Sequence, residues 1–151
     1  MDKKILTWDN LGRILELFNK EKIVFTNGCF DILHPGHIHI LDQAKSYGDM
    51  LIVGLNSDNS IKRLKGPSRP KVSQNDRLKI LSSIKFVDYV VLFEEETPLK
   101  LIEKIKPNFL VKGGDYTVET VVGHEIARVE IFPIVEGYST TETIEKLNEK
   151  I

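Results

Sequence analysis

The sequence predicts a single α/β domain in which a doubly wound, Rossmann-like parallel sheet carries helices on both faces. Two observations predict this fold: short apolar runs recur along the chain, and amphipathic stretches separate them. The runs are almost continuously apolar, as expected of strands that are covered on both faces. A length of 151 residues suits one domain, which we place at 1–151.

Five strands are predicted, with the sheet order 3-2-1-4-5 when the strands are counted along the chain. They cover residues 23–25, 50–55, 87–93, 109–112 and 129–132. In such a sheet, ligands bind at the carboxyl ends of the strands, where the strand order reverses. We therefore expect the ligand site between the first and fourth predicted strands.

Each predicted helix begins at a capping residue or at a first-turn proline. The starts are Thr7, Pro35, Ser73, Thr97 with Pro98, and the capping-box sequence that opens at Ser139. Residues 62–71 differ, because they hold five basic residues, two prolines and a glycine without helical periodicity. This segment is predicted to be a charged loop.

The composition excludes several classes of function. The chain has 21 basic and 22 acidic residues, so a polybasic nucleic-acid-binding surface is not predicted. No apolar run approaches the roughly 20 residues of a membrane span, and the N-terminus lacks a signal-peptide-like stretch. We expect a cytoplasmic protein without nucleic-acid or membrane partners. The single cysteine, Cys29, excludes an internal disulfide.

The most informative stretch, TNGCFDILHPGH at residues 26–37, follows the first predicted strand and runs into a helix. Backbone N–H groups and the positive end of a helix dipole favour phosphate at such a place. Gly28 allows close approach of a ligand, and Gly36 leaves space against the first helical turn. His34 and His37, three positions apart, can face one point and donate hydrogen bonds to phosphate oxygens.

Two other interpretations of the histidines stay open. In the first, His34 caps the helix while His37 and His39 line its surface. In the second, the three histidines hold a metal ion, although steps of three and two residues do not share one helical face.

The pattern G-C-F-D-x-L-H-x-G-H resembles the signature of the cytidylyltransferase-like nucleotidyltransferases. Further motifs match in order: VGLNSD at 53–58, LKGP at 64–67, DR at 76–77, VKGGDY at 111–116 and EGYSTT at 136–141. Together they are most similar to the branch that adenylylates D-glycero-β-D-manno-heptose 1-phosphate, which is also found fused to a heptose kinase.

The resemblance implies direct transfer of AMP from ATP to a sugar 1-phosphate, with pyrophosphate as the leaving group and no covalent enzyme intermediate. It implies catalytic roles for His34, His37 and Lys65, and closure of the basic loop over ATP. The implied nucleotide-binding residues are Asn27, Gly28, Cys29, Phe30, Gly36, Arg77, Lys112, Gly113, Gly114, Asp115, Tyr116, Ser139, Thr140 and Thr141.

Three polar residues at strand ends, Asp31, Asn56 and Asp58, are assigned to the acceptor sugar or to ordering the loops. Asp31 can alternatively support the turn or a magnesium ion. The resemblance further implies that Mg²⁺ arrives with ATP, that the protein itself supplies no metal site, and that the chain forms a homodimer.

Two alternative functions remain. One is a cytidylyltransferase acting on a polyol phosphate such as glycerol 3-phosphate; the other is a nucleotide-binding regulatory module without turnover. The chain has Val135 and Glu136 where related cytidylyltransferases often carry an arginine, which favours adenylyl transfer. Residues 123–130 are shorter than the helix and turn of close relatives, so we expect a truncated helix or a loop there.

Overall fold

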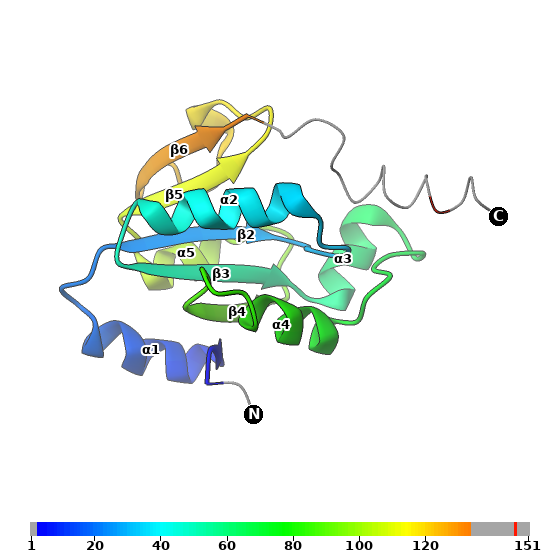
Figure 1. Cartoon of the computed structure of the whole chain (residues 1–151), viewed down its shortest axis with the longest axis horizontal. Coiled ribbons are helices and arrows are strands. Elements are labelled where there is room, and N and C mark those ends of the chain that lie inside the picture. Colours follow the sequence, from blue (N-terminus) through cyan, green and yellow to red (C-terminus); the bar gives the residue numbers. More distant parts are fainter. Residues whose placement is uncertain (1–2, 134–146, 148–151) are drawn as a thin grey trace.

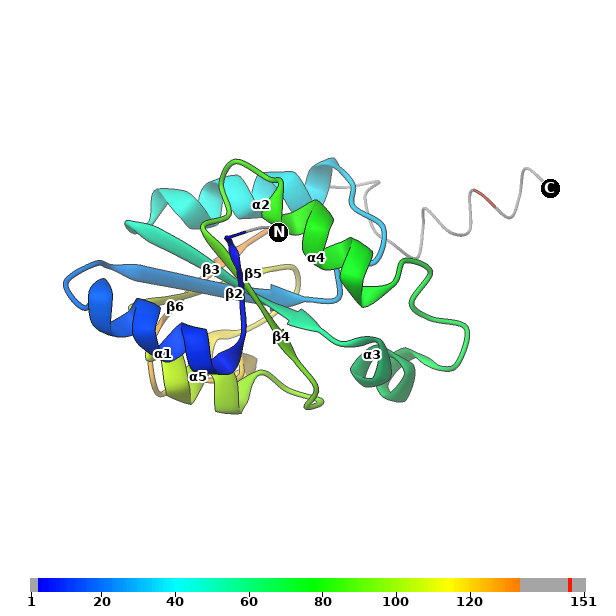
Figure 2. The same cartoon turned by 90° about the horizontal axis from the view of Figure 1, so that it is seen from below.

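The computed structural model describes residues 3–133 and residue 147, and it shows one sheet of parallel strands between two layers of helices (Figures 1 and 2). The strand order is β1-β4-β3-β2-β5-β6. The strands are β1 (Ile5–Leu6), β2 (Ile23–Gly28), β3 (Met50–Asn56), β4 (Tyr89–Phe93), β5 (Phe109–Gly113) and β6 (Arg128–Phe132).

The predicted fold class is confirmed, and the five predicted strands are β2 to β6 in the predicted order. The predicted count of five is wrong, because β1 adds an edge strand that pairs in parallel with β4. This strand has only two residues, Ile5 and Leu6, and is therefore too short for any hydrophobic periodicity to show.

Four of the five helices within residues 3–133 begin next to a predicted start, and α3 is the exception. They are α1 (Trp8–Leu17), α2 (Pro35–Ser46), α3 (Asp58–Lys65), α4 (Gln74–Ser82) and α5 (Leu99–Ile105). The side chains of Thr7 and Ser73 accept hydrogen bonds from the first turns of α1 and α4, and Pro35 is the first residue of α2. Helix α5 has Pro98 as its N-cap and no side-chain cap.

The prediction of a loop over 62–71 is wrong for its first four residues, which form the end of α3. Periodicity does not reveal this helix, because Ile61 is its only buried apolar residue. The available signal is its cap: the side chain of Ser57 accepts a hydrogen bond from the backbone N–H of Ser60. Gly66, with φ of +99°, ends the helix.

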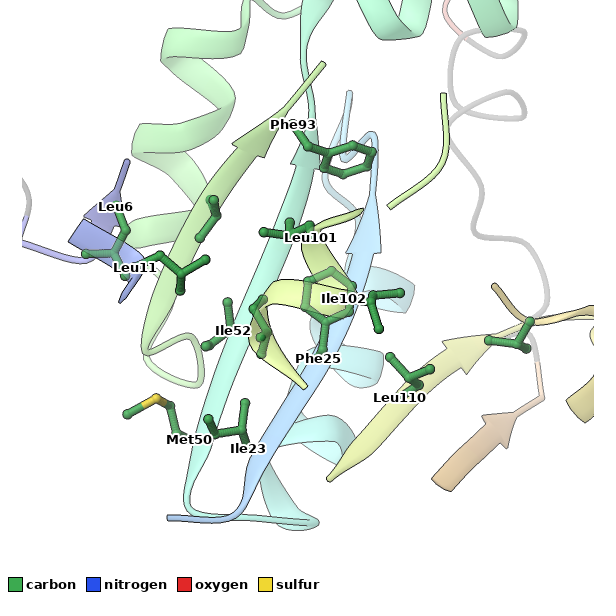
Figure 3. Close-up of a cluster of buried hydrophobic side chains, with 13 residues drawn as sticks. Leu6, Leu11, Ile23, Phe25, Met50, Ile52, Phe93, Leu101, Ile102 and Leu110 are labelled. Carbon is green, nitrogen blue, oxygen red and sulfur yellow. The ribbon is translucent and has the colours of Figure 1, made fainter. Parts of the chain in front are cut away.

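Helices α2 and α4 cover one face of the sheet, and α1 and α5 cover the other (Figure 2). Strand residues alternate between two apolar clusters, so that Phe25 and Ile52 point to α1 and α5 while Val24 points to α2 and α4. Figure 3 shows the first cluster, in which Leu101 and Ile102 of α5 lie over the strands. This double coverage explains why the strands read as continuous apolar runs.

The connection from β5 to β6 contains a 3₁₀ helix, η1 (Val118–Thr120), and turns, but no α-helix. The expectation of a truncated helix or loop over 123–130 is confirmed. None of the helices between residues 3 and 133 is long and apolar enough to cross a membrane. The last predicted helix, which starts at Ser139, and the Val135–Glu136 pair lie outside the described residues.

Candidate active site

The candidate site lies where strands β2 and β5 separate. Strand β2 pairs with β5 only as far as Phe25 and Leu110, whereas it stays paired with β3 as far as Gly28. The chain runs from β2 to β3 and β4 on one side, and only then to β5 and β6 on the other. The separation is therefore the point at which the strand order reverses, where sheets of this class bind ligands.

A pocket of about 210 Å³ occupies this opening. It is lined by Thr26, Asn27, Gly28, Cys29, Phe30, His37, Ile40, Lys65, Lys112, Gly113 and Tyr116. Nine of these residues are predicted site residues. The sequence does not predict Thr26 and Ile40 as site residues. The only indication in the sequence is that Thr26 lies near the end of a predicted strand and Ile40 in the helix that follows the histidines.

Two side-chain hydrogen bonds join the separated strand ends. Thr26 Oγ1 donates to the carbonyl oxygen of Val111 at 2.8 Å, and Lys112 Nζ donates to Asn27 Oδ1 at 2.5 Å. The Lys112 ammonium also lies 5.7 Å from the ring centroid of Tyr116. Burial lowers the pKa of Lys112 to about 8, an effect that the nearby Cys29 partly opposes.

The turn between β2 and α2, residues 29–34, is called here the histidine turn. At its end His34 caps α2, because its Nδ1 accepts the N–H of Gly36 at 3.1 Å. The N–H of His34 in turn donates to Nδ1 of His37 at 3.3 Å, and the two rings stack with centroids 3.8 Å apart. Since each Nδ1 accepts a backbone N–H, each neutral ring carries its proton on Nε2.

His37 is a neutral hydrogen-bond donor at pH 7. Burial, followed by the charges of His34 and Lys65, lowers its pKa from the ordinary 6.5 to about 4. Beside it lies Phe30, whose ring centroid is 5.3 Å from that of His37 and whose φ of +46° is unusual for a residue other than glycine. The histidine turn is thus a strained segment at the pocket, as functional turns often are.

The backbone N–H groups in the first turn of α2 already have acceptors within the chain. The N–H of Gly36 donates to His34 Nδ1, and the N–H groups of His37 and Ile38 donate to the His34 carbonyl. The first turn of α2 is therefore capped by its own residues. Its dipole still favours an anion, and the His37 side chain at the pocket can contact that anion.

The charge of the pocket selects for anionic ligands. Its described lining contains Lys65 and Lys112 but no aspartate or glutamate. A phosphate-bearing ligand would therefore meet two ammonium groups and the Nε2–H donor of His37 without a carboxylate to repel it.

Arg77 does not line the pocket, which corrects the prediction that it steadies a triphosphate. Its side chain is buried, and all three nitrogens already donate. Nε donates to the carbonyl of Val72 at 2.9 Å, Nη1 to those of Cys29 and Asn56 at 2.8 and 2.7 Å, and Nη2 to Asp58 Oδ1 at 2.8 Å. The guanidinium ties the histidine turn to the end of β3 and the start of α3.

The three candidates for the acceptor sugar make contacts that order loops, which is one of the two roles predicted for them; the sugar-binding role stays a prediction. Asp58 pairs with Arg77, and Asn56 Nδ2 donates to Ser60 Oγ at 3.0 Å. The buried Asp31 accepts hydrogen bonds from Arg69 Nε and from the backbone of residues 71–72.

The closure of the basic loop over ATP stays a prediction, and the structure shows where the residues of this loop lie. Lys65 belongs to α3, and residues 66–72, called here the basic segment, are fastened to Asp31. Lys65 therefore reaches the pocket from the end of a helix, and Asp31 hydrogen-bonds the basic segment to the histidine turn.

Several predicted residues do not line the pocket. His34 donates its backbone N–H to His37, Gly36 donates to His34, and Gly114 and Asp115 follow β5; none of the four lines the pocket. The remaining predicted residues, Ser139, Thr140 and Thr141, lie outside the described residues.

The metal interpretation of the histidines finds no support within residues 3–133 and 147. No group of three or more histidine, cysteine or acidic side chains in this part of the chain can hold a metal ion. The Nδ1 atoms of His34 and His37 also already accept backbone N–H groups, so neither Nδ1 lone pair is available to a metal ion.

Fold and site together define a doubly wound α/β protein whose switch point carries a basic pocket suited to a phosphate-bearing ligand. The model of the cytidylyltransferase-like family matches residues 25–146, and the chain belongs to this family. It is accordingly a nucleotidyltransferase.

Curated relatives named bifunctional protein HldE are similar to the chain. The protein of Helicobacter pylori strain P12 is 56% identical over 138 residues, and that of Geobacter metallireducens is 52% identical over 153 residues. These alignments cover 91% and 97% of this chain but only 30% and 31% of the relatives. The chain thus spans about a third of the length of the curated relatives it matches.

Two solved structures share the fold. The lipopolysaccharide core biosynthesis protein from Thermoplasma volcanium has a TM-score of 0.63 and 32% identity, over 79% of this chain and 99% of that one. Pantoate-β-alanine ligase from Francisella tularensis, solved with a β,γ-ATP compound and β-alanine, has a TM-score of 0.62 and 19% identity, over 96% of this chain and 76% of that one. The second likeness concerns the fold alone.

Proposed function

We propose that the chain transfers AMP from ATP to the phosphate group of a sugar 1-phosphate, with D-glycero-D-manno-heptose 1-phosphate as the acceptor and ADP-heptose and pyrophosphate as products. The observation that carries this proposal is the pocket at the β2–β5 separation, where His37, Lys65 and Lys112 surround one space without a carboxylate among the described lining residues. The HldE relatives and the lipopolysaccharide core biosynthesis protein support an acceptor of the sugar class.

The chemistry requires no protein nucleophile. An oxygen of the acceptor phosphate attacks the α-phosphorus of ATP and forms a new P–O bond. The bond from that phosphorus to the oxygen that bridges to the β-phosphate breaks, and pyrophosphate leaves with the electron pair. Because a phosphate monoester has its second pKa near 6, the attacking group is already largely dianionic at neutral pH and needs no general base.

The side chains at the pocket supply charge stabilisation and position. In the transition state, negative charge builds on the non-bridging oxygens of the α-phosphate. The Nε2–H of His37 and the ammonium of Lys65 are suited to stabilise it, and one such preorganised donor contributes about 10²–10³ in rate. The stacked His34 holds the His37 ring in place and fixes its tautomer.

The β5 side of the pocket is suited to the adenosine. A Cβ added to Gly113 would lie 2.7 Å from Ile40 Cδ1, so a larger residue at this strand end would require the Ile40 side chain to shift. Tyr116 offers a ring beside this backbone, and Lys112 offers a cation. We assign the base and the ribose to these residues.

A divalent cation would be held mainly by the substrate. The polar groups that line the pocket are cations, amides and a neutral imidazole. Mg²⁺ prefers carboxylate and other oxygen ligands, so this set does not fit a resident Mg²⁺. We therefore propose that Mg²⁺ enters with ATP on its phosphate oxygens, and we derive no step from a protein-bound metal. The homodimer stays a prediction.

The test incubates the purified chain and Mg²⁺ with ATP or CTP and with heptose 1-phosphate, other sugar 1-phosphates or glycerol 3-phosphate. We expect pyrophosphate release and a product of the mass of ADP-heptose only with ATP and the heptose. CTP is included because the family model is that of cytidylyltransferase-like proteins. Turnover only with CTP and the polyol phosphate contradicts the proposal in favour of that alternative, and nucleotide binding without pyrophosphate release favours a regulatory module.

A further inference from the structure

A buried carboxylate fixes the position of the basic segment. The side chain of Asp31 is fully buried, and its oxygens accept hydrogen bonds from Arg69 Nε at 2.9 Å, from the N–H of Lys71 at 2.8 Å and from the N–H of Val72 at 2.9 Å. Burial alone would raise the pKa of Asp31, but these hydrogen bonds and the charge of Arg69 lower it. Asp31 is therefore an anion that is saturated with donors.

Asp31 accepts a hydrogen bond from only one of the nitrogens of the Arg69 guanidinium. The side chain of Arg69 is 12% exposed, and Nε is occupied by Asp31. The terminal nitrogen Nη2, in contrast, is buried and has no hydrogen-bond acceptor in the described structure. A buried donor without an acceptor is rare in folded proteins, and it destabilises the state that contains it.

Arg69 does not itself line the pocket, but its partner Asp31 places it next to residues that do. Asp31 belongs to the histidine turn, three residues before His34, so it holds Arg69 against the turn that leads into the pocket. Lys65, just before the basic segment, lines that pocket. Both basic residues come from the chain that follows β3, whereas the residues assigned to adenosine come from β5, on the other side of β2.

We propose that Arg69 is a substrate-binding residue whose Nη2 donates to an anionic oxygen of the acceptor's phosphate group. This inference rests on the proposed function. A guanidinium suits the task, because it can pair with Asp31 through one nitrogen and with a phosphate oxygen through another. The acceptor then occupies the β3 side of the pocket and the nucleotide the β5 side, and Nη2, which has no acceptor among the described residues, is paired by the acceptor phosphate.

The first test is Arg69→Lys, measured by initial rates with each substrate varied in turn. A lysine ammonium keeps the positive charge, but it has a single nitrogen in place of the separate Nε and Nη2 donors of the guanidinium. We expect the KM for the sugar 1-phosphate to rise by about 10- to 100-fold, the loss of one charge-assisted hydrogen bond, with the KM for ATP within about twofold. The matched control is Arg63→Lys, which changes an exposed arginine of α3 and is expected to leave both KM values unchanged.

The other outcomes overturn the proposal in distinguishable ways. A folded Arg69→Lys variant with the wild-type KM for the acceptor shows that Nη2 does not bind it. A rise confined to the KM for ATP assigns the contact to the triphosphate instead. No pyrophosphate release by the wild-type protein with any acceptor overturns the proposed function and this inference together.

A second measurement does not depend on the variant's folding. A crystal structure of the wild-type protein with the sugar 1-phosphate and a nonhydrolysable ATP analogue locates both substrates directly. We expect an acceptor phosphate oxygen within hydrogen-bond distance of Arg69 Nη2. An acceptor phosphate bound elsewhere, with Nη2 still unpaired, overturns the assignment.

Discussion

The rings of His34 and His37 stack 3.8 Å apart, and the backbone N–H of His34 donates to Nδ1 of His37. The two residues therefore form a reciprocal capping box. The side chain of His34 accepts a hydrogen bond from the first turn of α2, and the side chain of His37 accepts one from the backbone of His34. The two interpretations of this pair, helix capping and phosphate binding, are compatible. Nδ1 serves the helix, and Nε2–H remains the donor that His37 can offer to a ligand.

His37→Ala is expected to lower kcat by at least about 100-fold, because it removes a donor aimed at charge that develops in the transition state. Initial rates of pyrophosphate release measure the effect. His39→Ala, an exposed histidine on the same helix, is the control and is expected to turn over at the wild-type rate. Near-normal turnover of His37→Ala removes the imidazole from the mechanism.

His37→Gln separates the structural role of His37 from its catalytic role. Glutamine three residues after an N-cap can accept the N–H of the cap residue, as in a capping box, so stability should stay close to that of the wild type. Its amide does not reproduce the position of the imidazole Nε2–H. We expect wild-type thermal unfolding with a kcat still lowered by at least about tenfold. Recovery of full turnover by glutamine would assign His37 to capping alone.

The low pKa of His37 links folding stability to pH. The unfolded chain binds a proton at this histidine near pH 6.5, whereas the folded chain binds it only near pH 4. Stability contributed by the neutral ring is therefore fully present above pH 6.5 and is lost progressively as the pH falls toward 4. Urea unfolding between pH 4 and 7 should show a steeper loss in the wild type than in His37→Gln. Identical pH dependence of the two proteins contradicts the assignment.

Lys112 makes nucleotide binding sensitive to alkaline pH. Its ammonium, with a pKa of about 8, is charged below that pH and neutral above it. Because a phosphate-bearing ligand binds the charged form better, kcat/KM for ATP should fall as the pH rises through 8. Lys112→Arg keeps its charge and should move this decline to higher pH. Lys104→Arg, whose ammonium lies 5.9 Å from the ring centroid of Trp8 in α1, is the control and should leave the profile unchanged.

The fold could be predicted from the sequence wherever burial on both faces imposes an apolar run, as at 50–55 of β3. The fold could not be predicted where an element is short and buries few apolar residues. Ile5 and Leu6 form a strand only because β4 offers them a partner, and α3 forms with a single buried apolar residue behind a Ser57 cap. Short elements of this kind depend on tertiary contacts that one sequence does not display.

The candidate site shows the same division. The motif around Cys29 and His37, and the strand end at Lys112, are local in sequence, and the structure brings them to one pocket. The roles of Arg77 and Asp31 depend on carbonyl and amide groups that come from distant segments. A sequence does not distinguish a buried structural arginine from an arginine that binds phosphate at the surface, because only the fold decides which acceptors surround the guanidinium.

Arg77→Met tests whether this arginine is a structural tie or a phosphate ligand. Removal of the guanidinium leaves Asp58 and the carbonyls of Val72, Cys29 and Asn56 without their donor. Breaking one partner of a buried, hydrogen-bonded ion pair costs about 3–5 kcal/mol, and we expect the free energy of urea unfolding to fall by about that amount. Arg128→Met, which removes an exposed arginine paired with Glu130, is the control and should cost less than about 1 kcal/mol. If Arg77→Met unfolds like the wild type but has a raised KM for ATP, Arg77 is a triphosphate ligand after all and the structural assignment is wrong.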